Sequence, residues 1–347
     1  MDFGEALGTD RQECPSYLLL AHPKPSVLGS PMPQASPTPT TTRERLGFVR
    51  VAAVSPELVL GDVSKNVAIL AREARTLAQR GCRMVVFPEL SLTGYSCADL
   101  FHTEALRAAA VSGLGELAQA THDLPTVLVV GLPLLVQDRL YNVAAVLAKG
   151  RVLGLVPKSF LPNSAEFYER RWFSPAHTLG TSMTTLNGED VPIGAELLFE
   201  ARDVTGFVLG VEICEDLWTV IPPSSHLALA GATLLANPSA STEVLGKAPY
   251  RRHLVAQQAA RCLAAYVYAG AGAGESSTDV VYSGHCLVAE SGILLGESER
   301  FSFETRQTVA DVDVQHLAHD RLKSSSFRDE ASTMPMHRIT FDLGPAL

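Results

Sequence analysis

The sequence contains no C-x-x-C pair, although six cysteines are scattered along its 347 residues (Cys14, Cys82, Cys97, Cys214, Cys262 and Cys286). Structural zinc sites and thioredoxin-like redox motifs both need closely spaced cysteines, so neither kind of site is expected. Scattered, unpaired thiols are typical of a reducing compartment, and we therefore expect a cytoplasmic protein.

The sequence also lacks an excess of positive charge and a long apolar segment. Its 28 Lys and Arg residues are outnumbered by 37 Asp and Glu residues, which gives a formal net charge of −9. A surface of that sign repels the phosphate backbone, so nucleic acid is not an expected partner. No segment is long enough to cross a bilayer, and the acidic first residues do not resemble a signal peptide, so no membrane association is expected.

Two further patterns are incomplete. The glycine-rich run at residues 270–274 (GAGAG) lacks the G-K-[ST] ending of a phosphate-binding loop. His226, His253 and His285 do not have the mutual spacing of metal ligands, so no metal site is expected. The chain has no internal repeat, but its 46% hydrophobic content is enough for a large core.

The order of apolar segments predicts a layered α/β domain. Pro, Ser and Thr dominate residues 23–42, so we expect residues 1–46 to form a disordered tail before a folded domain at 47–330. Within that domain, strand-like runs alternate with segments of helical spacing, and the last runs look like strands alone, which favours mixed sheets. Strands are predicted at 48–54, 84–87, 127–131, 142–148, 152–157, 207–213, 233–237, 266–269, 280–288, 293–295 and 308–312, and helices at 66–79, 105–120, 226–231 and 250–260.

Three polar residues stand at the ends of predicted strands. Glu89 follows VVFP, Lys158 follows GLVP, and Cys214 ends LGVEIC. Reactive side chains gather at such ends in layered α/β folds, because the sheet fixes the backbone while the next loop exposes the side chain. A nucleophilic thiol needs a base for its proton and a donor for the oxyanion, and a carboxylate and an ammonium group can supply both.

Taken singly, each of the three has an ordinary explanation. An isolated cysteine is most often an inert core residue. Glu89 alone would be read as a salt-bridge or capping residue, and Lys158 as a solvated strand end. The three together, each in its own local context, favour a cysteine-dependent amide hydrolase.

The segments around these residues resemble a known superfamily. FPELSLTGY, VPKSFLPN followed by EFYERR, and GVEICEDLW are similar to segments of the nitrilase superfamily of carbon–nitrogen hydrolases. The resemblance, which covers residues 48–330, implies a four-layer α-β-β-α sandwich with mixed sheets and a Glu-Lys-Cys triad. Further segments resemble the glutaminase domain at the start of glutamine-dependent NAD synthetases: ICEDLW, NPSAS at 237–241, GK at 246–247 and GESSTDVVYSGHC at 274–286.

The resemblance assigns roles to individual residues. It implies that Glu89 is the general base, Lys158 the oxyanion donor and Cys214 the nucleophile, with Glu169 as an auxiliary carboxylate. Ser164 stands where relatives commonly have a tyrosine that helps to close the glutamine pocket, so this departure concerns substrate binding and not the triad. The other positions that line this pocket in relatives are Tyr95, Glu215, Trp218, Ser241 and Lys247.

The function that the resemblance implies is glutamine hydrolysis through a thioester, with the ammonia used to amidate nicotinate adenine dinucleotide. No metal or organic cofactor is expected for the amidase step. ATP and Mg belong to a synthetase domain whose SGG-type nucleotide loop is absent from this sequence, and residues 331–347 are expected to begin the linker to it. A separate synthetase domain and further copies of this chain, in a homo-oligomer, are the expected protein partners.

Two alternatives stay open at this point. One is a free-standing carbon–nitrogen hydrolase that acts on another small ω-amide, which would suit both Ser164 and the absence of the synthetase loop. The other is a catalytically silent scaffold with a binding or regulatory role.

Overall fold

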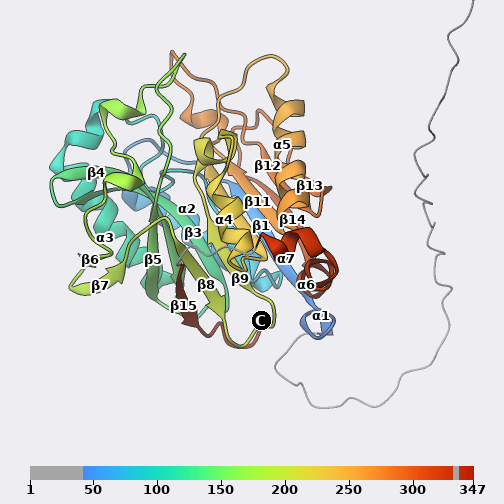
Figure 1. The fold of residues 1–347 in the computed structure, drawn as a ribbon. Helices are drawn as coiled ribbons and strands as arrows, with labels where there is room; N and C mark the ends of the chain where they lie inside the picture. Colours follow the sequence, from blue (N-terminus) through green and yellow to red (C-terminus); the bar gives the residue numbers. More distant parts are fainter. Residues whose placement is uncertain (1–41, 331–335) are drawn as a thin grey trace, which may run out of the picture. The chain divides into compact units, whose positions relative to one another are not determined.

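In the computed structural model, which describes residues 42–330 and 336–347, two β-sheets lie face to face between two layers of helices (Figure 1). The predicted tail lies outside the described residues as far as residue 41. Its last part does not: Thr42–Arg45 form helix α1, and the carboxylate of Glu44 pairs with Arg83 at 2.8 Å. The folded domain therefore begins before the predicted boundary at residue 47.

One sheet has six strands in the order β14-β1-β2-β3-β4-β5. The neighbours β1, β2 and β3 run parallel, and the remaining neighbours pair antiparallel, so the sheet is mixed as predicted. Helices α2 and α3 cover its outer face. The bounds are β1 Phe48–Ser55, α2 Val63–Gln79, β2 Met84–Val86, α3 Glu104–Ala120, β3 Val127–Val136, β4 Arg139–Ala148, β5 Arg151–Pro157 and β14 Arg306–Asp313.

The other sheet has seven strands in the order β13-β12-β11-β10-β9-β8-β15. Its neighbours β9, β10 and β11 are parallel, and helices α4 and α5 pack on its outer face. In Figure 1, α3 and α5 lie on opposite sides of the two sheets. The bounds are β8 Leu197–Ala201, β9 Val208–Val211, α4 Pro223–Leu229, β10 Leu234–Ser239, α5 Lys247–Cys262, β11 Ala265–Gly270, β12 Cys286–Glu290, β13 Ile293–Glu297 and β15 His337–Phe341.

Alternating side chains on the strands build two different cores. On β1, Val49, Val51 and Ala53 face the layer between the sheets, whereas Ala52 and Val54 face the helices α2 and α3. Strands that are covered on both faces read as continuous apolar runs, which is why these strands were visible in the sequence. The four-layer sandwich that the resemblance implied is therefore confirmed.

Several elements were not predicted. Residues 280–285 are irregular rather than strand, and β15 lies in the predicted linker. There His337 pairs with Leu197 in a parallel register, and Leu343 is fully buried, so residues 337–343 complete the domain instead of leaving it. The other elements that the sequence pattern missed are β6 Met183–Leu186, β7 Glu189–Pro192, β8, α6 Val314–Lys323, α7 Ser325–Asp329 and the 3-10 helices η1 Ala98–His102, η2 Glu169–Arg171, η3 Ala176–Thr178, η4 Cys214–Trp218 and η5 Ala273–Glu275.

Within residues 42–330 and 336–347, no helix has the length and apolar character needed to span a membrane.

Candidate active site

The ends of three strands bring charged groups and a thiol together between the sheets. Glu89 follows β2, Lys158 directly follows β5, and Cys214 opens η4 just after β9. All three residues are at most 3% exposed. The charges of Glu89 and Lys158 both act on the thiol of Cys214. The structure thus places the three strand ends near one another between the sheets, with Lys158 and Glu89 in direct contact.

The ammonium group of Lys158 is the centre of the charged cluster. Its Nζ donates to Glu89 Oε1 at 2.6 Å and to Glu169 Oε1 at 2.7 Å. Burial alone would lower the pKa of Lys158, but the charges of Glu169 and Glu89 outweigh it and hold the pKa well above its ordinary value. Lys158 is therefore a permanent cation beside the thiol.

Glu89 is held by donors from both sheets. Its Oε1 also accepts from Asn142 Nδ2 at 2.6 Å, and its Oε2 accepts the N–H of Ala240 at 2.9 Å. An ionised carboxylate only accepts hydrogen bonds, so these donors suit that form. Gly131 makes the arrangement possible: a Cβ at this position would lie 2.1 Å from the backbone nitrogen of Leu90, which follows Glu89.

Glu169 is the second carboxylate of the cluster and is 1% exposed. It accepts a hydrogen bond from the hydroxyl of Tyr95 at 2.6 Å in addition to the bond from Lys158. Burial raises the pKa of Glu169, and the charge of Glu89 adds to the increase, while Lys158 and Tyr95 oppose it. Lys158 thus lies between the buried carboxylates of Glu89 and Glu169 and is bonded to both.

Cys214 is held in a left-handed backbone conformation, with φ at +45°. Its N–H donates to Asn237 Oδ1 at 3.0 Å. Burial raises the pKa of the thiol, Glu89 raises it further, and Lys158 opposes the rise. The resting group at neutral pH is therefore the thiol, and it has to lose its proton to a base before it can attack a carbonyl.

Asp216 ties the turn of Cys214 to the loop after Lys158. Its Oδ1 accepts the N–H of Phe160 at 2.8 Å, and its Oδ2 accepts the N–H of Ile213 at 2.9 Å. Burial raises the pKa of Asp216 to about 8. This side chain, which sequence reasoning missed, fixes the spacing between the two halves of the site.

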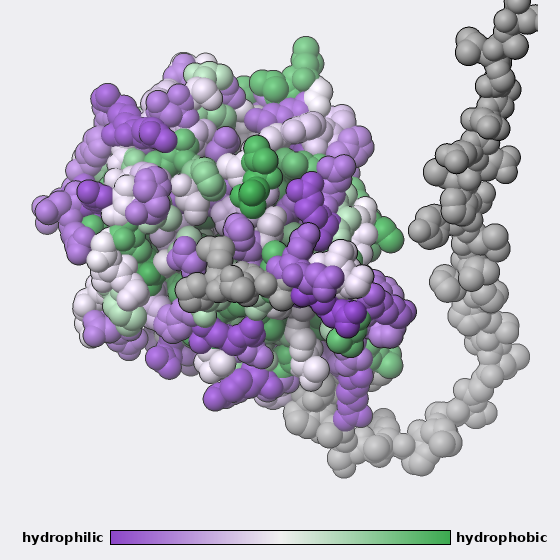
Figure 2. Space-filling model, in the orientation of Figure 1, coloured by the Kyte–Doolittle hydropathy of each residue, from purple (hydrophilic) through white to green (hydrophobic). Residues whose placement is uncertain are grey.

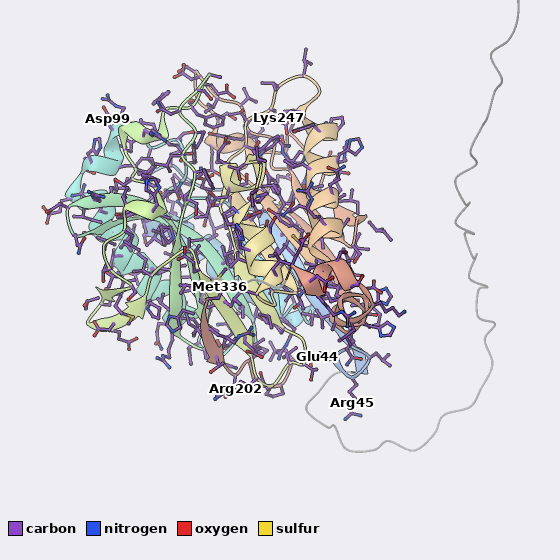
Figure 3. The ribbon with its side chains drawn as sticks, viewed as in Figure 1. Glu44, Arg45, Asp99, Arg202, Lys247 and Met336 are labelled. Carbon is purple, nitrogen blue, oxygen red and sulfur yellow. The ribbon has the colours of Figure 1, made fainter. Side chains whose placement is uncertain are left out.

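Apart from Ser164, the residues predicted to line the substrate pocket lie near the cluster. Tyr95 belongs to it directly, Ser241 is buried, and Glu215 is half-buried with a pKa raised by burial. The Nζ of Lys247 lies 5.2 Å from the ring centre of Trp218, and burial lowers its pKa. Figure 3 places Lys247 at the start of α5, at the same end of the molecule as Asp99.

Ser164 is not brought into the cluster. It is exposed on the loop between Leu161 and Glu169, and its carbonyl oxygen accepts the N–H of Phe167 at 3.0 Å. Near this loop a cavity of about 190 Å³ is lined by Tyr95, Glu166 and Tyr168, among others. Tyr95 is thus shared between this cavity and the charged cluster.

The fold and the buried Glu, Lys and Cys define a carbon–nitrogen hydrolase, an amide-cleaving enzyme class. The chain belongs to the carbon-nitrogen hydrolase family, whose model matches residues 50–321.

Relatives with curated names share this domain. The chain is 47% identical over 305 residues to a glutamine-dependent NAD(+) synthetase of Mycobacterium tuberculosis, and the match covers 86% of this chain and 45% of the relative. It is 27% identical to the protein of that name in Rattus norvegicus, over 81% of this chain and 40% of the relative. The chain thus spans less than half of the length of these relatives.

Solved structures show the same architecture. A glutamine-dependent NAD(+) synthetase from Cytophaga hutchinsonii matches with a TM-score of 0.67 and 29% identity, over 76% of this chain and 43% of that chain. An amidase of the nitrilase superfamily from Nesterenkonia matches with a TM-score of 0.58 and 20% identity, over 79% of this chain and 94% of that one, which supports the fold alone.

Other polar residues of the site gave no signal that sequence reasoning used. Asn142 and Asn237 lie within apolar strands, and Glu275 reaches the cluster from η5, where its Oε2 accepts the N–H of Tyr95 at 2.8 Å. A polar side chain inside an otherwise apolar strand could have marked the two asparagines, because a buried polar group needs a partner.

Proposed function

We propose that this protein is a glutamine amidohydrolase that releases ammonia through a thioester on Cys214. The observation that carries the proposal is the single ammonium group of Lys158, which bridges Glu89 and Glu169 beside a buried thiol. Burying a cation between two carboxylates is unfavourable because all three groups lose their hydration. Such clusters are typical of functional sites, and proton transfer at Cys214 would use this one.

The first half of the reaction forms the thioester. The sulfur of Cys214 attacks the side-chain carbonyl carbon of glutamine, and Glu89 accepts the thiol proton as the bond forms. The resulting oxyanion is stabilised by Lys158. When the carbon–nitrogen bond breaks, Glu89 returns this proton to the leaving amine, which departs as ammonia.

The second half releases glutamate. Water attacks the thioester, Glu89 accepts its proton, and the proton returns to the sulfur as the carbon–sulfur bond breaks. Glu169 holds Lys158 in place throughout. We propose that this step needs no metal or organic cofactor, since a carboxylate and a fixed ammonium group handle both the proton and the developing charge.

A backbone N–H supplies the second oxyanion donor. Among the first N–H groups of η4, that of Cys214 is bonded to Asn237 and that of Asp216 to the carbonyl of Ile213. The N–H of Glu215 lies between them at the start of the helix, where backbone donors have no partner within the helix. We assign the oxyanion to Glu215 N–H and Lys158 Nζ.

Recognition of a free amino acid follows from the opposite charges at the mouth of the site. Lys247 can pair with the α-carboxylate and Glu215 with the α-ammonium group, and each is partly buried, which strengthens such pairs. The relatives named glutamine-dependent NAD(+) synthetase support glutamine as this amino acid. We further propose that the ammonia is delivered to a synthetase domain that uses ATP and Mg to amidate a dinucleotide precursor, as the resemblance in the sequence implies.

The direct test is to measure glutamate and ammonia formed from glutamine, with and without a synthetase partner. Cys214→Ala is the matched control, because alanine fits the same space. We expect turnover by the wild-type chain and a loss of at least about a thousandfold in the variant. No turnover by the wild type, even with the partner present, would disprove the proposal.

A second candidate substrate is another small ω-amide. It is favoured by the exposed position of Ser164, which leaves the loop at 162–168 without a large side chain at that place. Rates for glutamine, asparagine and short amides without an α-carboxylate separate the two. A preference for an amide that lacks the charged α-groups would favour this candidate.

We also propose that the chain forms a homo-oligomer. Figure 2 shows hydrophobic side chains that project at the end of the molecule where α5 begins. Exposed apolar residues there include Val244 and Leu245, and Val220 and Ile221 are exposed before α4. Clustered exposed apolar side chains mark interaction surfaces, and light scattering coupled to size-exclusion chromatography tests this assembly.

A further inference from the structure

A chain of hydrogen bonds connects the backbone of Cys214 to the outer side of the seven-stranded sheet. The N–H of Cys214 donates to Asn237 Oδ1 at 3.0 Å, and Asn237 Nδ2 donates to the hydroxyl of Tyr266 at 2.9 Å. That hydroxyl donates to Glu212 Oε1, and Glu212 Oε2 accepts the N–H of Ser224 at 2.7 Å. All these residues are at most 3% exposed.

The direction of these bonds is fixed at the far end. The phenol of Tyr266 donates to one oxygen of Glu212 and the N–H of Ser224 to the other, so Glu212 acts as the acceptor for both. Burial and the charge of Glu212 raise the pKa of Tyr266 well above its ordinary value, so the phenol keeps its proton. The lone pair of the hydroxyl then attracts the NH₂ of Asn237, and the amide oxygen is turned toward Cys214.

The orientation of Asn237 matters because an amide has two unlike ends. A flipped amide would set its NH₂ against the N–H of Cys214, so that two donors face each other and the bond is lost. Cys214 needs this bond, since its left-handed backbone, with φ at +45°, is less stable than an ordinary conformation. The surrounding structure has to hold a residue in such a conformation.

We propose that Glu212 and Tyr266 are positioning residues that orient the Asn237 amide and thereby hold the sulfur of Cys214 for attack. This inference rests on the proposed function in one respect, that Cys214 is the reactive thiol. Neither side chain reaches the substrate, because both lie on the face of the sheet that packs against α4 and α5. They act through Asn237.

We call the hydrogen-bonded series Glu212, Tyr266 and Asn237 the relay. Two substitutions interrupt it in different ways. Tyr266→Phe removes the hydroxyl and leaves the amide of Asn237 free to flip. Glu212→Gln keeps the shape but offers one acceptor for two donors, Tyr266 and Ser224, so the phenol can turn its proton toward Asn237 and favour the flipped amide. Tyr141→Phe is the matched control, because Tyr141 is equally buried and its hydroxyl bonds Thr178 at 3.2 Å on the other sheet.

The experiment measures the rate at which iodoacetamide alkylates Cys214, with the modified peptide identified by mass spectrometry, together with kcat and KM for glutamine. We expect Tyr266→Phe and Glu212→Gln each to lower the alkylation rate and kcat about tenfold or more, with KM within twofold. The double variant should be no worse than the more affected single one, since both act through one amide. Tyr141→Phe should stay within twofold in every measurement.

The outcomes separate this inference from the proposed function. Alkylation and kcat within twofold of wild type in a folded Tyr266→Phe or Glu212→Gln protein would overturn the relay, even if glutamine is hydrolysed. If the wild-type protein does not hydrolyse glutamine, but the two variants still alkylate more slowly at Cys214 than the wild type, the proposed substrate is wrong and the relay is supported. If neither variant folds, the two residues are structural supports of the sheet and the inference is wrong.

Discussion

The two sheets contribute different chemistry to one site. The six-stranded sheet supplies the charged groups, Glu89 and Lys158, which satisfy each other through ion pairs. The seven-stranded sheet supplies the thiol of Cys214 and a neutral partner for its backbone, Asn237. Changes on the first sheet should therefore disturb proton transfer and stability together, whereas changes on the second should disturb geometry with less effect on stability.

The largest effect is expected from Lys158→Met on the charged side. It removes an oxyanion donor, so kcat for glutamine should fall at least about a thousandfold. It also leaves Glu89 and Glu169 buried without a cation, which should lower the free energy of unfolding by about 3–5 kcal/mol. Turnover assays and urea denaturation measure the two consequences.

The exposed Lys65 offers a control with the same change of side chain and charge. Lys65→Met should leave both kcat and the free energy of unfolding close to the wild-type values. If Lys158→Met were as stable as the wild type, the carboxylates would have to be protonated in the folded protein, and the division of chemistry between the sheets would fail.

A pair of glycines sharpens the comparison. An alanine Cβ at Gly131 on β3 would lie 2.1 Å from Leu90 N, and one at Gly270 on β11 would lie 2.7 Å from the carbonyl oxygen of His285. Both variants should lose on the order of 2 kcal/mol of stability, because backbone has to move. Gly131→Ala should also lower kcat about a hundredfold, since the displaced backbone carries Glu89.

Gly270→Ala is the matched control, and its kcat in the folded fraction should fall less than tenfold. Equal losses of kcat in both variants would show that the active site responds to any distortion of the sandwich, and not to the position of Glu89 in particular. Thermal unfolding followed by circular dichroism gives the folded fraction for each.

The sequence predicts the charged residues of the site better than the residues that position Cys214. Glu89 and Lys158 end apolar runs that read as strands, and the resemblance to nitrilase-superfamily segments predicts that they act together. Glu212 sits inside such a run two residues before Cys214, and only the strand pairing shows that it reaches Tyr266. Hydrogen bonds between residues distant in the chain depend on the register of the strands, which local patterns do not give.

The missed elements have a similar cause. β15 (HRITF) is a short edge strand with exposed polar residues, and its place beside β8 is set by a chain connection of more than a hundred residues. The run at 280–285 was predicted as strand from its composition, but Gly284 has φ at +70° there and the segment turns instead. Edge strands and irregular segments carry weak periodic signals, because only one face or neither is buried.

A substitution at Lys247, at the start of α5, tests how the seven-stranded sheet and its helices contribute to substrate recognition. Lys247→Gln removes the cation proposed to bind the α-carboxylate, so KM for glutamine should rise about tenfold or more with a smaller change in kcat. Arg261→Gln, an exposed position at the other end of α5, changes the net charge equally and should leave KM unaltered. An unchanged KM in Lys247→Gln would remove Lys247 from the proposed pocket.

The smallest effect concerns the carboxylate that joins the two halves, Glu275, which comes from the loop after β11 and holds the backbone of Tyr95. Burial raises the pKa of Glu275 to about 7 from an ordinary 4.5. The folded protein therefore binds its proton more tightly than the unfolded chain does, and the stabilisation present below about pH 4.5 is lost as the pH rises through about 7.

Glu275→Gln cannot titrate, so its free energy of unfolding should decline less steeply between pH 5 and about pH 7.5 than that of the wild type. The decline should not vanish, because burial also raises the pKa of Asp216 and of Glu169. The variant should be less stable at every pH, since an amide offers one oxygen to the N–H groups of Tyr95 and Gly272. Parallel pH profiles for the two proteins would mean that Glu275 keeps an ordinary acidity, and that the joint between the sheets tolerates a charge.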